Sequence, residues 1–118
     1  MAVPMMPWRW RDRAFNLRRR ALQASAAMHE AQGRFEMALE RVQALLSDDP
    51  LQEMHHCEAM RLLAACGRRE ALWAQYNQCI HLLKTKLGLQ PMAETVALLQ
   101  ALLCGLLPSL ACTGWRQP

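Results

Sequence analysis

Helix-breaking residues divide this chain of 118 residues into segments of similar length. The breakers are glycines, prolines and one Asp-Asp-Pro turn, at Pro4, Pro7, Gly33, Asp48, Asp49, Pro50, Gly67, Gly88, Pro91, Gly105 and Pro108. The segments between them are long enough for helices and rich in Ala, Leu, Gln, Glu and Arg, which favour helices. We therefore predict helices at residues 11–31, 34–47, 51–65, 68–87 and 92–104.

Apolar residues recur at helical spacing in the second and fourth segments. The two stripes are Phe35, Ala38, Leu39, Val42, Leu45 and Leu46, and Leu72, Tyr76, Cys79, Ile80, Leu83 and Leu87. Each pattern places one apolar face on one side of a helix. We expect Tyr76 to belong to the core and Trp73, which lies off the stripe, to be half exposed. Asp49 and Pro50 are typical of the start of a helix, and Gly88 of an end.

The dipeptide Gly33-Arg34 recurs as Gly67-Arg68, and the same offset relates Ala31 to Ala65. A period of about 34 residues is that of the tetratricopeptide unit, a pair of antiparallel helices whose apolar face is buried only when units stack. The predicted fold class is all-α, with tetratricopeptide-like stacked helical hairpins and a closing C-terminal helix. In such a stack the first helix of each pair lines a groove.

The excess of positive over negative charge is confined to the start of the chain. Residues 1–20 hold six Arg and one Asp, a net charge of +5, whereas the other 98 residues hold eight Lys or Arg and nine Asp or Glu, a net charge of −1. Residues of this segment that could contact nucleic acid are Arg9, Arg11, Arg18, Arg19 and Arg20. We expect any DNA affinity there to be weak and non-specific, because the rest of the fold presents no basic face.

The cysteines and histidines do not form a recognisable reactive site. The five cysteines, at positions 57, 66, 79, 104 and 112, contain no C-x-x-C pair, so we expect reduced, buried thiols. His55, His56 and Cys57 are consecutive, and on a helix they point about 100° apart, so they cannot converge on a metal. Cys57 is the only candidate nucleophile, and packing explains it better. We predict no enzyme activity, metal or cofactor.

No targeting or membrane-spanning segment is expected. Residues 1–7 are apolar but contain two prolines, and Arg9 follows. Residues 98–110 are apolar but shorter than a span and contain Gly105 and Pro108. These features favour a cytoplasmic protein with no membrane partner.

Several phrases resemble the bacterial transcriptional activator domain, the tetratricopeptide-like module of antibiotic-regulatory-type activators. They are GRFEMALERVQALLSDDPLQE (33–53), His56 with Met60-Arg61, GRREALWAQYNQCIHLLKTKLGLQP (67–91) and AET (93–95). The first is generic to tetratricopeptides, and KLGLQP with the following ET is far more specific. The resemblance covers residues 11–104, preceded by a lead-in at 1–10 and followed by a tail at 105–118.

Two features depart from the family pattern. In the family this module follows a winged-helix DNA-binding domain, and the short Trp- and Arg-bearing lead-in leaves no room for one. The tail after residue 105 matches nothing in the pattern. The expectation is a fragment of a larger regulator or a standalone remnant.

The resemblance implies a regulatory protein–protein interaction module of a transcriptional activator. The partner would be transcription machinery, another domain of the regulator or a second copy, with no direct DNA binding expected. Residues predicted to line its groove are Gln52, His55, His56, Ala59 and Arg61. Two alternatives stay open: a small DNA-binding regulator that uses the Arg-rich segment, and a tetratricopeptide adaptor unrelated to transcription.

Overall fold

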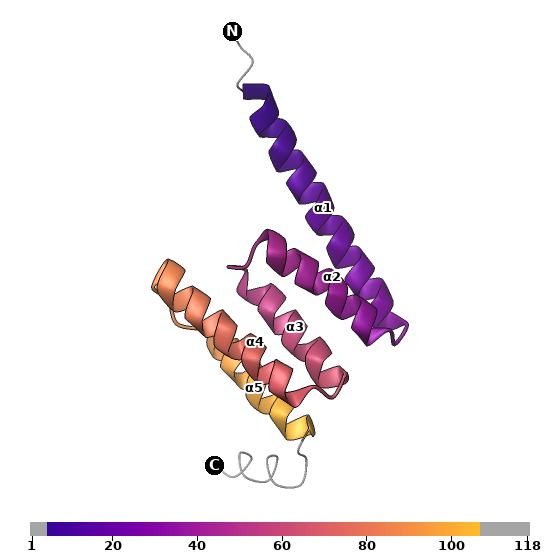
Figure 1. Ribbon diagram of the computed structural model, residues 1–118, viewed down its shortest axis with the longest axis vertical. Helices are drawn as coiled ribbons and strands as arrows, with labels where there is room; N and C mark the ends of the chain where they lie inside the picture. Colours follow the sequence, from indigo (N-terminus) through magenta and orange to yellow (C-terminus); the bar gives the residue numbers. More distant parts are fainter. Residues whose placement is uncertain (1–4, 107–118) are drawn as a thin grey trace.

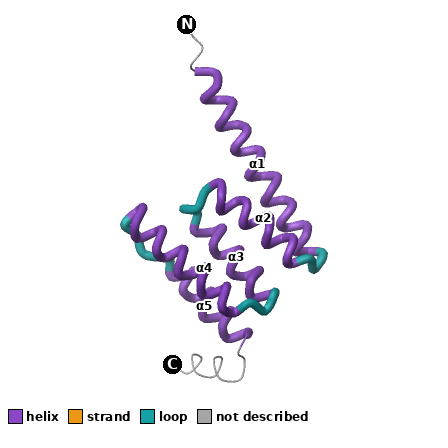
Figure 2. The backbone as a smooth tube through the Cα atoms, viewed as in Figure 1, coloured by secondary structure: helices purple, strands orange, loops and turns teal. Residues whose placement is uncertain are grey.

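The structure, a computed structural model, describes residues 5–106 and is entirely helical across them apart from the connecting turns (Figures 1 and 2). The elements in chain order are α1 (Met5–Ala31), α2 (Phe35–Asp48), α3 (Glu53–Ala65), α4 (Arg69–Leu82), the π-helical turn η1 (Leu83–Leu87) and α5 (Ala93–Leu106). The predicted all-α, tetratricopeptide-like class is confirmed. No helix in this part of the chain is both long and apolar enough to cross a membrane.

Two helical hairpins stack side by side and a fifth helix closes the stack. α1 packs against α2, α2 against α3, and α3 against α4, while α5 lies against α3 and α4 (Figure 1). The core between these layers includes Leu39, Val42, Met60, Leu62 and Leu72, all buried. Burial of this apolar surface, at about 25 cal/mol per Å², is the main term that holds the hairpins together.

The two hairpin turns have the same geometry. Gly33 has a φ of 75° and Gly67 a φ of 74°, in the left-handed region that glycine adopts without a steric penalty. In the first turn the Arg34 amide donates to the His29 carbonyl at 2.8 Å, and in the second the Arg68 amide donates to the Leu63 carbonyl at 2.9 Å. The two bonds join equivalent positions of the two repeats and have the pattern of a Schellman motif. The predicted repeat register is therefore confirmed.

The fourth helix differs from its prediction at its end. Residues 68–87 were expected to form one α-helix, but the last turn, Leu83–Leu87, is π-helical. Thr85 Oγ1 donates to the His81 carbonyl at 2.7 Å, and the Leu89 amide reaches back to the Leu83 carbonyl at 3.1 Å. A hydroxyl that bonds a carbonyl four residues back competes with the helical ladder. The wider turn shifts the phase, so Leu87 is exposed and the prediction that it completes the apolar stripe is wrong.

Two helices begin more than one residue away from their predicted starts. α1 begins at Met5, which places Pro7 in the first turn, where the missing N–H has no intrahelical partner to lose. It runs unbroken through residue 10, and the proposed division into lead-in and domain stays a prediction. α3 begins at Glu53 instead of 51, because Asp49 organises the preceding turn: its Oδ1 accepts the Leu51 amide at 3.4 Å.

The N-terminus of α5 is capped by a side chain from α3. Glu53 Oε2 accepts hydrogen bonds from the Met92 amide at 2.8 Å and from Thr95 Oγ1 at 2.5 Å. Thr95 is fully buried, and its hydroxyl also lies 3.3 Å from Cys57 Sγ. A carboxylate at a helix N-terminus satisfies free amides and complements the helix dipole. Thr95 and the Met92 amide thus help to fix the closing helix on α3.

The cysteines do not share one state. Cys57, Cys66 and Cys79 are free thiols, but only Cys79 is buried, so the expectation of burial is wrong at Cys57 and Cys66. Cys104 is disulfide-bonded, so the expectation of reduced thiols is wrong at this position. Sequence spacing alone could not identify this, because disulfide formation depends on the distance between two chain segments and not on their separation in sequence. Cys112 lies outside the described residues.

Candidate interaction surfaces

The two adjacent histidines of α3 point to different neighbours. His56 Nε2 lies 2.7 Å from the Pro50 carbonyl oxygen, and its Nδ1 lies 2.7 Å from Gln75 Nε2 on α4. Because a carbonyl only accepts, Nε2 carries the proton, and Nδ1 accepts from the amide of Gln75. His55 instead faces α1, with its Nε2 3.4 Å from Gln23 Nε2. Each histidine therefore joins α3 to another part of the stack.

The five residues predicted to line a groove divide into two groups. His55, His56 and Ala59 are buried within the stack, so they can influence a partner only by positioning α3. Gln52 and Arg61 are exposed. Arg61 Nη1 donates to Glu30 Oε2 at 2.7 Å, which ties α3 to α1 and orients the guanidinium on the outer surface. The assignment of these residues to partner binding stays a prediction.

The outer face of α3 carries Met54, Glu58, Arg61 and Ala65, spaced four, three and four residues apart. Met54 has 69% of its surface exposed, the largest value among the exposed large hydrophobic side chains of the described residues. An exposed methionine beside a glutamate and an arginine offers both an adaptable apolar contact and charged groups. We refer to Met54, Glu58 and Arg61 as the α3 face. Of these three residues only Arg61 was predicted from the sequence, because the rotation of α3 about its axis depends on its packing against the other helices.

A pocket of about 400 Å³ lies on the other side of the stack, between α2, the turn before α3, and α4. Its lining residues are mostly polar and comprise Gln43, Leu46, Ser47, Pro50, His56, Gln75 and Gln78. His56 is the only predicted groove residue among these lining residues. None of them is an Asp, Glu, Lys or Arg, and they offer no pair of groups suited to acid–base chemistry.

Cys57 has no catalytic partner among the residues that the structure describes. Its thiol faces Thr95, while both neighbouring histidines bond elsewhere. Burial raises the pKa of the Cys57 thiol, and the nearby Glu53 and Glu58 carboxylates raise it further. Burial also raises the pKa of Cys79 to about 12. A nucleophilic cysteine needs the opposite shift. Among residues 5–106, no group of three or more potential metal-binding side chains comes together.

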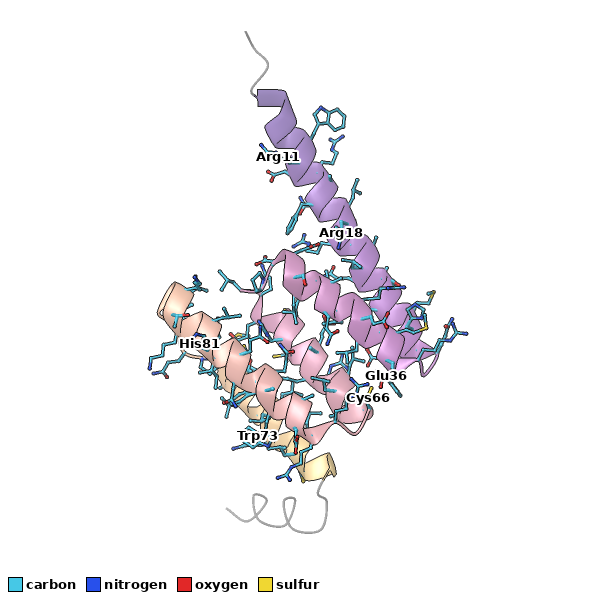
Figure 3. The ribbon with its side chains drawn as sticks, in the orientation of Figure 1. Arg11, Arg18, Glu36, Cys66, Trp73 and His81 are labelled. Carbon is cyan, nitrogen blue, oxygen red and sulfur yellow. The ribbon has the colours of Figure 1, made fainter. Side chains whose placement is uncertain are left out.

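The arginines of the first helix do not form one patch. Arg11 and Arg20 are exposed, whereas Arg18 Nε donates to Asp48 Oδ2 at the end of α2, at 2.5 Å (Figure 3). Arg19 is partly buried. The side chain of Arg9 lies outside the described residues. Part of the predicted basic segment therefore stabilises the first hairpin, and the rest faces solvent.

The aromatic pair of α4 agrees with its prediction. Tyr76 packs against the core and Trp73 is 38% exposed. Their rings meet edge to face with centroids 6.3 Å apart, a favourable geometry for two aromatic side chains. Trp73 points away from the centre of the stack (Figure 3). The pair therefore leaves one aromatic edge on the outer surface of α4.

Comparison with known proteins agrees with this architecture. Residues 4–103 match the family model of the bacterial transcriptional activator domain, a match that includes all of α1 to α4 and most of α5. No curated protein and no solved structure matches the chain significantly. Because the match covers most of the chain, this protein belongs to the bacterial transcriptional activator domain family.

Proposed function

We propose that this chain is a protein–protein interaction module through which a bacterial transcriptional activator contacts its partner. Family membership over residues 4–103 carries the proposal, since the family is associated with transcriptional activators. A stack of helical hairpins holds side chains of successive helices on one rigid surface, which suits recognition of a partner rather than chemistry.

The α3 face is the surface that we assign to this role. Arg61 is held by Glu30, so its guanidinium is ordered before a partner arrives and loses less entropy on binding. Met54, about two turns earlier on the same helix, supplies apolar area that is exposed in the chain by itself. Gln52, exposed just before α3, donates one amide hydrogen to Asp49 Oδ2 at 3.2 Å and offers a further donor and an acceptor to a partner. The buried His55, His56 and Ala59 hold α3 in place.

A transcriptional fusion tests this function. The full chain is joined to a DNA-binding domain of known operator, and transcription from a promoter beside that operator is measured in bacteria. We expect activation by the unchanged chain and loss of most of it, about tenfold, on Met54→Glu, because a charge would have to be desolvated in the interface. Circular dichroism checks that the variant remains helical.

Met37→Glu is the matched control, since Met37 is an exposed methionine of α2, away from the α3 face. It should leave activation within about twofold of the unchanged chain, as an exposed substitution outside the interface does. A fusion that never activates would favour an adaptor unrelated to transcription. Equal losses for both methionine variants would show that the α3 face has no special role.

A further inference from the structure

α1 carries a second apolar stripe, on a face that no other described helix covers. Trp10, Ala14, Leu17, Ala21, Ala24 and Met28 follow one another at spacings of four, three, four, three and four residues. This is the spacing of the a and d positions of a heptad repeat, which meet a partner helix along one seam. All six residues are exposed, including 59% of Trp10, 58% of Leu17 and 49% of Met28.

This stripe is distinct from the face of α1 that packs on α2. Ala26 and His29 are buried in the hairpin, and Leu22 is half-buried with them. At about 100° per residue, Leu17 and Met28 lie on a different side of the helix from Ala26. α1 is therefore apolar on two sides, and only one of them is used within the described residues. A helix of this kind is typical of a position between two packing partners.

Arginines flank the stripe on both edges. Arg11 and Arg18 occupy the position that follows a d residue, and Arg13 and Arg20 the position that precedes an a residue. These are the e and g positions, which face the flanks of a partner helix and select it by charge. Arg18 is paired with Asp48, and the guanidinium of Arg13 lies 6.0 Å from the centroid of the Trp10 ring. Within the described residues, Arg11, Arg13 and Arg20 have no carboxylate partner.

A second copy of the chain is a poor occupant of this stripe. In an antiparallel pair centred near residue 19, Arg18 and Arg20 of one copy would lie among the same arginines of the other. In a parallel pair, Arg13 would face Arg18 of the other copy. Like charges at such positions destabilise the pair, and neither edge holds an Asp or Glu between residues 11 and 27 that could relieve them.

The charge pattern instead matches a partner with acidic flanks. We propose that the outer stripe of α1 docks an amphipathic helix of another protein, with apolar residues along its seam and Asp or Glu on both edges. The seam would cover Trp10, Leu17 and Met28, and the carboxylates would neutralise Arg11, Arg13 and Arg20. DNA fits less well, since phosphates would satisfy the arginines but leave the apolar seam between them in water.

The inference deepens the proposed function and rests on it, since it adds the chemistry of one partner at a surface separate from the α3 face. Its test uses the purified full chain and a fluorescent synthetic peptide of about three heptads, with Leu at a and d and Glu at e and g. Fluorescence anisotropy should show binding with a Kd of about 10⁻⁶–10⁻⁵ M, which corresponds to a binding free energy of about −8 to −7 kcal/mol. The same peptide with Lys at e and g should bind at least about tenfold more weakly.

Three variants separate the contributions. Leu17→Glu removes apolar contact at an exposed site and should weaken binding by about tenfold or more, while helicity by circular dichroism is retained. Joint reversal by Arg13→Glu and Arg20→Glu should weaken the Glu peptide and strengthen the Lys peptide, a swap that general loss of folding would not produce. Arg69→Glu, an exposed arginine at the start of α4, is the matched control and should change neither.

The proposal would be overturned if the Glu peptide bound no better than one with its Leu positions scrambled, or if Leu17→Glu left its affinity unchanged. Sedimentation showing a dimer that Leu17→Glu dissociates would overturn it in favour of a second copy on the stripe. Tighter binding of a short DNA duplex, lost on the double arginine reversal but kept in Leu17→Glu, would overturn it in favour of nucleic acid. None of these results would change the expected loss of activation in Met54→Glu, because Met54 lies on the α3 face and not on the stripe of α1.

Discussion

In the first hairpin α1 has 27 residues against 14 in α2, whereas in the second α3 and α4 have 13 and 14. At about 1.5 Å per residue, α1 exceeds α2 by about 20 Å. Its N-terminal half extends beyond the rest of the stack (Figure 1). The turns that close the two hairpins nevertheless have matching φ angles and matching hydrogen bonds.

This difference separates two determinants of the fold. When the two repeats are aligned on Gly33 and Gly67, α3 corresponds to positions 19–31 of α1. Positions 5–18 therefore have no counterpart in the second hairpin. The turn geometry is local and is repeated where Gly-Arg recurs. The length of the first helix depends instead on helix propensity and on what packs beside it. The extension carries the first part of the apolar stripe, from Trp10 to Leu17, and most of the arginines of α1.

The largest expected effect contrasts the core with the extension. Leu72→Ala removes a fully buried side chain and should lower the free energy of unfolding by about 2–5 kcal/mol, through lost burial and a residual cavity. Leu17→Ala, on the extension, should change it by less than about 0.5 kcal/mol. Urea denaturation of both variants measures this. Equal losses would mean that the extension is part of the cooperative core.

Removal of the α5 cap should have an intermediate effect. Glu53→Ala takes the acceptor from the Met92 amide and leaves the buried Thr95 hydroxyl with fewer partners, at a cost of about 1–2 kcal/mol. In the variant, amide hydrogen exchange should accelerate more in α5 than in α2, relative to the unchanged chain. Glu40→Ala, at an exposed position of α2, is the control and should have little effect. Unchanged exchange in α5 would show that the closing helix does not depend on this cap.

The two turn glycines provide the most direct test of equivalence between the hairpins. Gly33→Ala and Gly67→Ala should each cost about 1 kcal/mol, because alanine is strained at positive φ. Neither added methyl group would meet another atom within 4 Å, so conformation alone sets the cost. Gly105→Ala, inside α5, should stabilise the protein instead. Melting temperatures of the Gly33→Ala and Gly67→Ala variants that differ by more than the experimental error would contradict the equivalence of the two turns.

The smallest expected effect is at the exposed ion pair between the two helices of the first hairpin. Arg18 and Asp48 have 57% and 24% of their side chains exposed, so water screens the pair. A double-mutant cycle with Arg18→Ala and Asp48→Ala should yield a coupling energy of about 0.5 kcal/mol or less. A coupling above about 2 kcal/mol would mean that this contact, rather than packing, sets the position of the extension.

The number of helices, their order and their connecting turns were determined by the amino-acid sequence itself. Gly33 and Gly67 were identifiable because left-handed turn geometry depends on the residue at that position and its immediate neighbours. The apolar stripe of α2 was equally local, since its spacing defines one face of a helix wherever that helix packs. Family membership followed from short phrases whose residues occupy these same turns and faces.

Only the tertiary structure decided which side chains meet. His55 and His56 are adjacent in sequence, yet one faces α1 and the other α4, and Ala59 is buried although it was predicted to line a groove. The pairing of Glu53 with Thr95 joins two helices that are distant in sequence. Such contacts depend on how far each helix is rotated and shifted against its neighbours, and packing of the whole core sets those quantities, whereas the spacing within a single helix does not.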